Sequence, residues 1–448
     1  MTYSACIRLG AALTCLLTSA FVFADSPAKP IPKRWVDADT GHLVVRLSEE
    51  SGSRSLYFHQ NAYTAEGDKM VLSLDSPKGV AVVDLRDFSV KRLYSHPDMN
   101  VLFVGQKSRD VYLTQIAPDD EGNTVYPSNE LQAPTNILAV NLDTGKVREV
   151  ATIDGGKIHS INSDETLLIG AYAEQAHNLE TGPRDKRFEA KYEALGPDGK
   201  PLSFADAKEV RMDERLEMGI PMEIFTINLK TGERKVIHQA TDWLNHVQFS
   251  PVDPNQIMFA HEGPWHKVDR IWTTDTKGTK PRKIHTRSMN MEIAGHEFFG
   301  FDGEQIFYDL QTPRGQDFWL ASYNLKTGER VWRHMDRDEW SVHFNVSRDG
   351  KLFAGDGGDS EMVARAQNGK WIYLFRDDPV KDVAGIHARD SASLIKPSVL
   401  RAEKLVNMQQ HDYRLEPNVT FTPDGKWVVF RSNMHGPVHT YAVKVAKE

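Results

Sequence analysis

Short apolar runs separated by polar turns recur along the whole chain. In seven places a turn of Asp, Gly, Asn or Ser precedes an apolar run of five to seven residues. Runs of this length bounded by turn residues are typical of β-strands, and helical periodicity is scarce. We therefore expect strands at residues 69–74, 111–115, 166–172, 256–261, 305–310, 351–355 and 426–431.

A second pattern predicts tight turns between further strands. Asp-Thr-Gly or Lys-Thr-Gly ends an apolar run at Gly145, Gly232 and Gly328. Glycine readily adopts the positive φ that hairpin turns require. Each of these sites therefore predicts a β-hairpin.

Strands and hairpins that repeat every roughly 40–60 residues predict the blades of a propeller. The seven repeats predict an all-β fold, a seven-bladed β-propeller that forms a single domain over residues 25–448. A strand at 43–47 is expected beside 427–430, where it would close the ring and cover the sheet edges. The alternative is a pair of β-sandwiches.

Two segments interrupt this repeat of strands and turns. Residues 181–218 are long and charged, and we expect them to form an insertion over one propeller face. Residues 377–397 form a second irregular segment. Long loops in a compact domain are usually functional or mobile.

Residues 1–24 have the pattern of a secretory signal peptide. Arg8 precedes an apolar stretch, and Ala24 suits cleavage before Asp25. The stretch is short for a membrane span, and an uncleaved anchor is the alternative. We therefore expect a periplasmic or secreted protein, without stable membrane insertion after cleavage.

Composition excludes several kinds of chemistry. Both cysteines, Cys6 and Cys15, lie in the expected signal peptide, so the mature chain has neither a disulfide framework nor a catalytic thiol. The net charge of −8 argues against nucleic acid as a partner. The chain has no Gly-x-Ser-x-Gly motif and no phosphate-cradling glycine-rich loop.

Several of the 17 histidines lie in polar segments next to turns. His246, His296 and His343 hold comparable positions in three consecutive repeats, so we expect them to converge near a central channel. No zinc-type motif with local spacing is present. A metal would therefore be bound by histidine nitrogen with carboxylate or amide oxygen, which suits manganese. Satisfied structural histidines are the alternative interpretation.

Five motifs in order give the chain a family resemblance. Together they resemble the oligogalacturonate lyases, polysaccharide lyase family 22, and the similarity extends from about Trp35 to Val443. The motifs are Trp243-Leu244-Asn245-His246, Phe259-Ala260-His261-Glu262-Gly263-Pro264, Gly295-His296-Glu297-Phe298, Gly355-Asp356-Gly357 and Phe421-Thr422-Pro423-Asp424-Gly425.

The resemblance implies a seven-bladed propeller with a manganese-type ion at the channel mouth. It also implies β-elimination of short pectic oligosaccharides. His246 matches the catalytic base of the family and His296 matches a metal ligand. The role of His343 stays open, and we expect it to bind substrate.

The chain departs from the family pattern in two places. Where the family has a glutamine and two histidines, this chain has Tyr413, Glu416 and Asn418. Glu416 and Asn418 can still ligate a metal through oxygen, and His411 could contribute from upstream. The catalytic arginine of the family falls near Glu223 here.

The resulting hypothesis assigns a role to each candidate residue. A divalent metal, Mn²⁺ by preference, holds the uronate carboxylate while His246 removes the C5 proton. The expected metal ligands are His296, Glu416, Asn418 and His411. The expected assisting arginine is Arg211 or Arg215 from the insertion, and the expected substrate-binding residues are His343, His261, Tyr413 and His59.

Two other functions remain open. The altered site could serve another uronate polymer, such as ulvan or a rhamnogalacturonan fragment. The chain could also be a non-catalytic binding propeller of the TolB type. A lyase should generate an unsaturated uronate, whereas a binding propeller should not.

Overall fold

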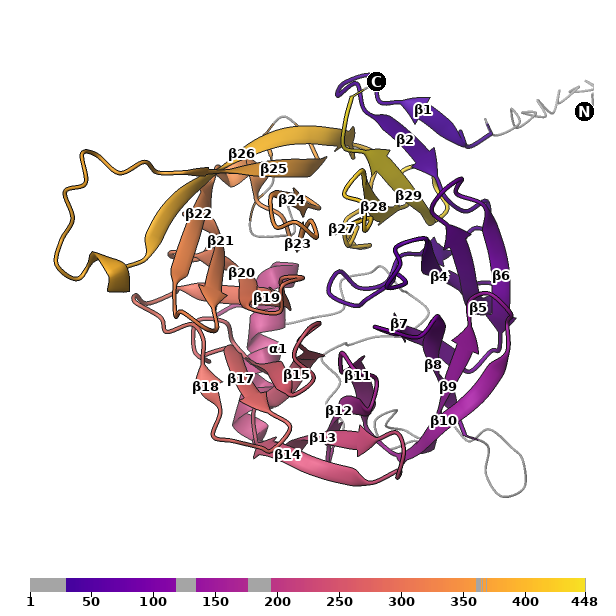
Figure 1. The fold of residues 1–448 in the computed structure, drawn as a ribbon. Helices are drawn as coiled ribbons and strands as arrows, with labels where there is room; N and C mark the ends of the chain where they lie inside the picture. Colours follow the sequence, from indigo (N-terminus) through magenta and orange to yellow (C-terminus); the bar gives the residue numbers. More distant parts are fainter. Residues whose placement is uncertain are drawn as a thin grey trace, which may run out of the picture. The chain divides into compact units, whose positions relative to one another are not determined.

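A computed structural model describes residues 30–117, 134–175, 195–359, 364, 366–367 and 369–447, whose regular secondary structure is nearly all β-strand (Figure 1). Residues Lys33–Glu448 form one compact unit. The expected signal peptide lies outside the described residues. No helix in the described part of the chain is both long and apolar enough to cross a membrane.

Five sheets contain four or five antiparallel strands each. The second sheet in chain order contains β7 (Met99–Val104), β8 (Asp110–Ile116), β9 (Pro134–Asn141) and β10 (Val147–Asp154). The third sheet contains β11 (Lys157–Ile161), β12 (Leu167–Ala173), β13 (Met222–Asn228) and β14 (Arg234–Ala240). They are preceded by β3 (Ser53–Arg54), β4 (Lys69–Asp75), β5 (Lys78–Asp84) and β6 (Val90–Ser95). They are followed by β15 (Trp243–Phe249), β16 (Gln256–Glu262), β17 (Ile271–Asp275) and β18 (Arg282–Lys283). The fifth sheet runs in the order β1 (Arg34–Val36), β2 (Leu43–Arg46), β29 (His439–Lys444), β28 (Trp427–Ser432) and β27 (Thr420–Phe421).

The sixth sheet has eight strands in two antiparallel halves. The first half is β19 (Ile293–Phe299), β20 (Gln305–Gln311), β21 (Phe318–Asn324) and β22 (Arg330–Met335). The second half is β23 (Phe344–Val346), β24 (Leu352–Gly355), β25 (Trp371–Pro379) and β26 (Lys396–Asn407). The outer strands β22 and β26 pair in parallel and join the halves. Two short 3₁₀ turns, Arg337–Glu339 and Ser391–Ser393, lie in this region.

The sequence patterns correspond to particular strands. The seven apolar runs fall in β4, β8, β12, β16, β20, β24 and β28, which are the second strands of their antiparallel sets. Gly145, Gly232 and Gly328 lie in the turns β9–β10, β13–β14 and β21–β22, each with φ between 72° and 74°. The all-β prediction is thereby confirmed, and six sheets argue against the pair of β-sandwiches.

The N-terminal strand joins the sheet of the C-terminal strands, although not where we expected. β2 pairs with β29, which separates it from β28. The strand therefore joins the last sheet as expected, but its direct neighbour is β29 and not residues 427–430. Because β1 then covers β2, the two ends of the described chain share one five-stranded sheet.

Hydrogen bonds between the inner strands link neighbouring sheets. The Tyr63 hydroxyl lies 2.9 Å from the Thr420 hydroxyl, which joins the first repeat to the last. Asn345 accepts from the Phe421 amide at 3.0 Å, and Gln248 donates to the Glu297 carbonyl at 3.0 Å. The first strands of successive sheets are therefore gathered around one centre, as Figure 1 shows.

The expected insertion contains a helix that the sequence patterns did not predict. α1 (Phe204–Met218) begins after Ser203, whose hydroxyl accepts from the Asp206 amide, and ends at Gly219 with φ 57°. These residues are favourable helix caps. Asp206 pairs with Arg314, and Asp213 pairs with Lys267, so the helix is tied to the loops after β20 and β16.

The second irregular segment is shorter than expected. β25 extends to Pro379 and β26 begins at Lys396, so only residues 380–395 lack strand structure.

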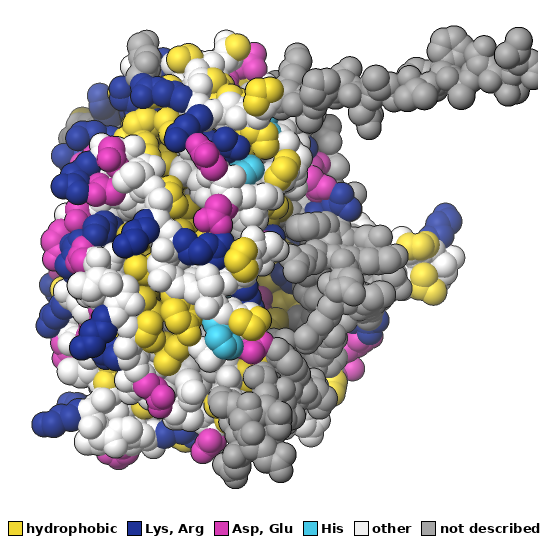
Figure 2. Space-filling model, turned by 90° about the vertical axis from the view of Figure 1, so that its right-hand side faces the viewer, with side chains coloured by type: hydrophobic (Ala, Val, Ile, Leu, Met, Phe, Trp, Pro, Cys, Tyr) yellow, Lys and Arg dark blue, Asp and Glu magenta, His cyan; other side chains and the backbone are white. Residues whose placement is uncertain are grey.

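The outer surface is mixed in charge. Figure 2 shows acidic and basic side chains interspersed on the face turned to the viewer.

Candidate functional site

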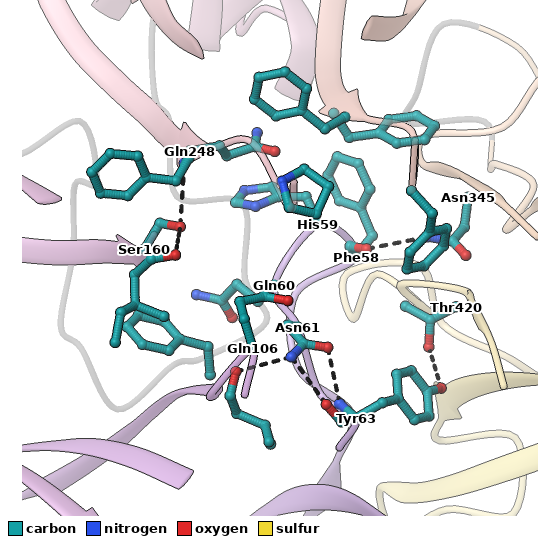
Figure 3. Close-up of a pocket in the computed structure, with 18 of the residues that line it drawn as sticks. Phe58, His59, Gln60, Asn61, Tyr63, Gln106, Ser160, Gln248, Asn345 and Thr420 are labelled. Carbon is teal, nitrogen blue, oxygen red and sulfur yellow. Dashed lines mark hydrogen bonds between the residues drawn. The ribbon is translucent and has the colours of Figure 1, made fainter. Parts of the chain in front are cut away.

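Residues 55–62, the central loop, enter the space enclosed by the inner strands. The Phe58 amide donates to Asn418 Oδ1 at 3.1 Å. Asn345 Nδ2 lies 3.4 Å from the Phe58 carbonyl (Figure 3). Asn61 Nδ2 donates to the Val104 carbonyl at 2.9 Å. Three different sheets therefore hold this loop and fix Tyr57, Phe58 and His59 at the centre.

Histidines from three repeats gather around the central loop. The His246 ring centroid lies 5.6 Å from that of His59 and 5.8 Å from that of Tyr57. The His343 centroid lies 4.9 Å from that of His296 and 5.2 Å from that of Tyr57. His59, His246, His296 and His343, the histidine cluster, are thus brought together from positions far apart in sequence.

Backbone irregularities direct two of these histidines. His246 has φ 47° and His296 has φ 49°, a left-handed conformation that residues other than glycine seldom adopt. Each lies where the register shifts between the first and second strand of its sheet. Bulges re-aim side chains and strain of this kind gathers at functional sites, so these residues are positioned for more than packing.

His246 and His296 are suited to remain neutral. Burial lowers the pKa of His246 to about 3 and places that of His296 well below its ordinary value. Nδ1 of each ring has no hydrogen-bond partner within the described residues. His246 Nε2 lies 3.9 Å from Glu262 Oε2. A neutral imidazole with a free nitrogen can accept a proton from a bound molecule.

His343 has the opposite electrostatic environment. Its Nδ1 lies 2.8 Å from Asp356 Oδ2, and its Nε2 lies 3.8 Å from Glu416 Oε2. Burial lowers the pKa of His343, but the Asp356 and Glu416 carboxylates outweigh burial and raise it above its ordinary value. His343 therefore favours the positively charged form beside its neutral neighbours.

The sequence patterns gave no indication of Arg270, the buried cation of the site. Its side chain is 6% exposed and lies between two buried carboxylates. Nε donates to Glu297 Oε2 at 2.8 Å, and Nη1 lies 3.4 Å from Glu262 Oε1. A single arginine just before β17 carries no motif, so only the fold reveals that it links two sheets.

Three predicted site residues form hydrogen bonds within the protein. His411 was expected to bind metal, but its Nδ1 lies 2.9 Å from the Ser432 hydroxyl and its Nε2 2.7 Å from the Leu415 carbonyl, which occupies both nitrogens. Asn418 accepts from Phe58 and donates to the Glu416 carbonyl. The Tyr413 hydroxyl donates to the Asp356 carbonyl at 2.8 Å. These residues hold the segment that carries Glu416.

The structure places three more candidates outside the histidine cluster. His261 lies 2.7 Å from Asp242 and 5.7 Å, ring to ring, from His238. Strand alternation directs it to the face opposite Glu262. Arg211 pairs with Glu214 along α1. Arg215 is 5% exposed, packs over the Trp243 ring at 5.1 Å, and has its pKa lowered to about 10 by burial.

Comparison with known proteins identifies the family. The family model described as oligogalacturonate lyase matches residues 206–448, which is more than half of the chain. The chain belongs to the oligogalacturonate lyase family. Because this is a family of polysaccharide lyases, membership favours the catalytic hypothesis over a non-catalytic binding propeller.

Relatives of the oligogalacturonate lyase family match almost the whole chain. The oligogalacturonide lyase of Pectobacterium atrosepticum is 26% identical over 422 residues, which covers 91% of this chain and 95% of that protein. The oligogalacturonate lyase of Dickeya dadantii is 26% identical over 421 residues, with the same coverage.

Solved structures of the family share the fold. An oligogalacturonate lyase in complex with manganese superposes with TM-score 0.68 at 22% identity, and the match covers 92% of this chain and 96% of that one. The oligogalacturonate lyase of Vibrio parahaemolyticus gives TM-score 0.67 at 24% identity, with the same coverage.

Only part of the metal-ligand set that the resemblance implied is available in this chain. His296 has a free Nδ1 and the Glu416 side chain is 42% exposed, so two of the expected ligands are available. His411 is not, because both of its ring nitrogens are hydrogen bonded, and Asn418 Oδ1 already accepts one hydrogen bond from the Phe58 amide. Over the described ranges, no three His, Cys, Asp or Glu side chains are arranged to hold a metal ion.

A cavity of about 450 Å³ lies on the other side of the central loop, where the inner strands end. Figure 3 shows its lining, in which amides such as Gln60, Asn61 and Gln248 alternate with aromatic rings. Phe58 and His59 line this cavity, and their rings also contact those of His343 and His246, respectively. The central loop therefore separates the two regions.

Acid should destabilise this fold through its buried histidines. Burial lowers the pKa of His59 and of His246 from 6.5 to about 3, so between these values the unfolded chain binds more protons. For each such histidine the free energy of unfolding should fall by about 1.4 kcal/mol per pH unit as pH drops through this window. His343, with a raised pKa, acts in the opposite direction and loses its contribution as pH rises.

Urea unfolding at about pH 7 and about pH 5 measures this effect. The His59→Asn variant should lose less stability on acidification than the wild type, because one buried imidazole is gone. If the free energy of unfolding of this variant changed with pH as much as that of the wild type, protonation of His59 would not contribute to the loss of stability in acid.

Proposed function

We propose that this chain cleaves short oligogalacturonides by β-elimination, with His246 as the base. The observation that carries the proposal is His246 itself. It is a buried, neutral imidazole with a free nitrogen, held in a left-handed conformation beside the central loop. Membership of the oligogalacturonate lyase family gives the reaction class.

The chemistry requires a base and a positive charge. The C5 proton of a uronate is weakly acidic because the adjacent carboxylate is already negative, so a nearby cation must stabilise the enolate-like intermediate. His246 takes the C5 proton, a C4–C5 double bond forms, and the C4–oxygen bond breaks. Arg270 bridges Glu262, beside His246, and Glu297, beside His296, and so fixes the orientation of the site.

Tyr57 is placed to protonate the leaving oxygen. Burial, and then the Glu416 carboxylate, raise the pKa of Tyr57 well above its ordinary value, so the phenol keeps its proton at neutral pH. Its ring is 5.8 Å from His246 and only partly buried. In each turnover His246 gains one proton and Tyr57 loses one. Proton exchange with water then returns both side chains to their starting forms.

The fold of the proposed lyase is a seven-bladed propeller. The two halves of the eight-stranded sheet together with the five other sheets give seven antiparallel sets of strands. Bonds between the inner strands support this arrangement, since the last repeat contacts the first through Thr420 and Tyr63. The N-terminal pattern of Arg8, an apolar stretch and Ala24 supports export to the periplasm or the medium.

A second candidate is elimination on another uronate, such as an ulvan or rhamnogalacturonan fragment. The observation that favours it is the altered segment of Tyr413, Glu416 and Asn418. Glu416 adds a partly exposed carboxylate beside His343, which changes the charge presented to a substrate.

Ultraviolet absorbance of the unsaturated product tests the proposal. Purified protein is mixed with digalacturonate or trigalacturonate, and with the corresponding neutral galactosides as controls. We expect absorbance to rise with the uronates alone. A rise only with ulvan or rhamnogalacturonan fragments would support the second candidate, and cleavage without a rise in absorbance would contradict elimination.

A further inference from the structure

The cavity beyond the central loop lies further along the inner strands than the histidine cluster. On β15, His246 belongs to the cluster, whereas Phe249, three residues later, lines the cavity. On β19, His296 and Phe299 repeat this arrangement. Three residues of a strand span about 10 Å. The cavity is therefore a different region from the proposed catalytic site, with the central loop between them.

Three glutamines on the cavity wall have hydrogen-bonding groups to spare (Figure 3). Among the described residues, the Gln106 side chain has no hydrogen-bond partner, and neither Nε2 of Gln60 nor Oε1 of Gln248 has one. Gln60 uses its Oε1 to accept from the Tyr57 amide at 3.2 Å. Gln248 uses its Nε2 to donate to the Glu297 carbonyl at 3.0 Å. Because a side-chain amide both donates and accepts, these groups can bind the hydroxyls of a ligand.

Phenylalanine rings form the apolar part of the wall. Phe249 and Phe298 are 5% and 3% exposed, whereas Phe301, in the β19–β20 turn, is 39% exposed at the rim. The volume of about 450 Å³ falls within the range of about 300–1,000 Å³ of small-molecule sites, which are usually lined by apolar rings with a few polar groups. The rings offer flat apolar faces to the carbon–hydrogen face of a sugar ring.

Arg348 gives the cavity a positive charge at its rim. It is exposed in the β23–β24 turn, and its guanidinium carbon lies 5.7 Å from the centre of the Phe301 ring. Nη1 lies 3.4 Å from the Ala65 carbonyl. No described carboxylate pairs with Arg348, and none of the described residues that line the cavity is Asp, Glu or Lys. Since a guanidinium can bind a carboxylate through two parallel hydrogen bonds, the cavity suits one anionic group.

We propose that this cavity is a second ligand site, which binds a uronate monosaccharide. Arg348 binds the carboxylate, the three glutamines bind hydroxyls, and the phenylalanine rings pack against the sugar ring. A neutral sugar of the same size leaves the guanidinium unused, and a small anion leaves the rings and the glutamines unused. This inference does not rest on the proposed function, because binding in the cavity requires no cleavage.

Calorimetry with galacturonate, galactose and acetate tests the inference on the full chain. We expect the wild type to bind galacturonate more tightly than either control. Arg348→Met should weaken galacturonate binding by about 10- to 100-fold and abolish the preference over galactose. Gln106→Trp, which reduces the cavity volume and keeps the charge, should also weaken it. Arg86→Met removes an arginine that is 77% exposed after β5, and this matched control should bind as the wild type does.

A second comparison separates the cavity from the histidine cluster. His246→Asn should bind galacturonate as the wild type does, and Arg348→Met should keep kcat on trigalacturonate within a few-fold of the wild type. If the wild type bound no galacturonate, or if Arg348→Met and Gln106→Trp bound it unchanged, the cavity would not be a uronate site. Loss of binding in His246→Asn, or loss of turnover in Arg348→Met, would overturn a site separate from the catalytic one. If binding depends on Arg348 but trigalacturonate is never cleaved, the proposed function fails and this inference stands.

Discussion

Replacing His246 by asparagine should lower kcat for oligogalacturonide elimination by about 100- to 10,000-fold, the usual contribution of a general base. The imidazole is a neutral group with a free nitrogen beside the central loop, and asparagine cannot take its place as a base. Asparagine tolerates the left-handed backbone at φ 47°, so the fold should survive. Initial rates of product absorbance, with circular dichroism on the same samples, measure both effects.

His261→Asn is the matched control for this variant. His261 lies on the neighbouring strand but pairs with Asp242, away from the histidine cluster. It should keep kcat within a few-fold of the wild type. Equal losses in the two variants, or full activity in His246→Asn, would remove His246 from the role of base.

Replacing Arg270 by methionine should destabilise the protein by about 3–5 kcal/mol, as removal of one partner from a buried ion pair usually does. Arg270 is 6% exposed, and its loss leaves Glu262 and Glu297, which are 7% and 0% exposed, without their cation. Urea unfolding measures the change. The triple variant Arg270→Met, Glu262→Gln and Glu297→Gln should recover part of it, since no unpaired charge remains.

Lys33→Met provides the comparison for Arg270. Lys33 pairs with Glu49 at the surface, where both side chains are about 70% exposed, so its loss should cost at most about 1 kcal/mol. If Arg270→Met lowered the free energy of unfolding by no more than Lys33→Met does, the ion pairs of Arg270 with Glu262 and Glu297 would not stabilise the site.

Much of the fold could be predicted because its signals are local. Turn residues before β4, β8, β12, β16, β20, β24 and β28 mark the second strand of every repeat. Gly145, Gly232 and Gly328 mark hairpins for the same reason, since positive φ is a requirement of one residue. The pairing of β2 with β29 depends on contacts between distant parts of the chain, and the helix α1 depends on its capping residues. The periodicity of apolar residues indicates neither.

The candidate site was predictable only in part. His246, His296 and His343 could be found because matching positions in successive repeats converge at the centre. Arg270 could not, because a single charged residue near a strand end has no pattern of its own. The hydrogen bonds of His411 to Leu415 and Ser432, and of Asn418 to Phe58, could not be predicted, since they form only in the folded chain.

The most direct test of the account is mass spectrometry of trigalacturonate cleaved in heavy-oxygen water. Unreacted oligosaccharide kept in the same water serves as the exchange control. Elimination by His246 predicts products whose new ends contain no heavy oxygen beyond this control and whose non-reducing unit carries a C4–C5 double bond. Heavy oxygen at the new end, with a saturated partner fragment, would mean hydrolysis and would contradict the central claim.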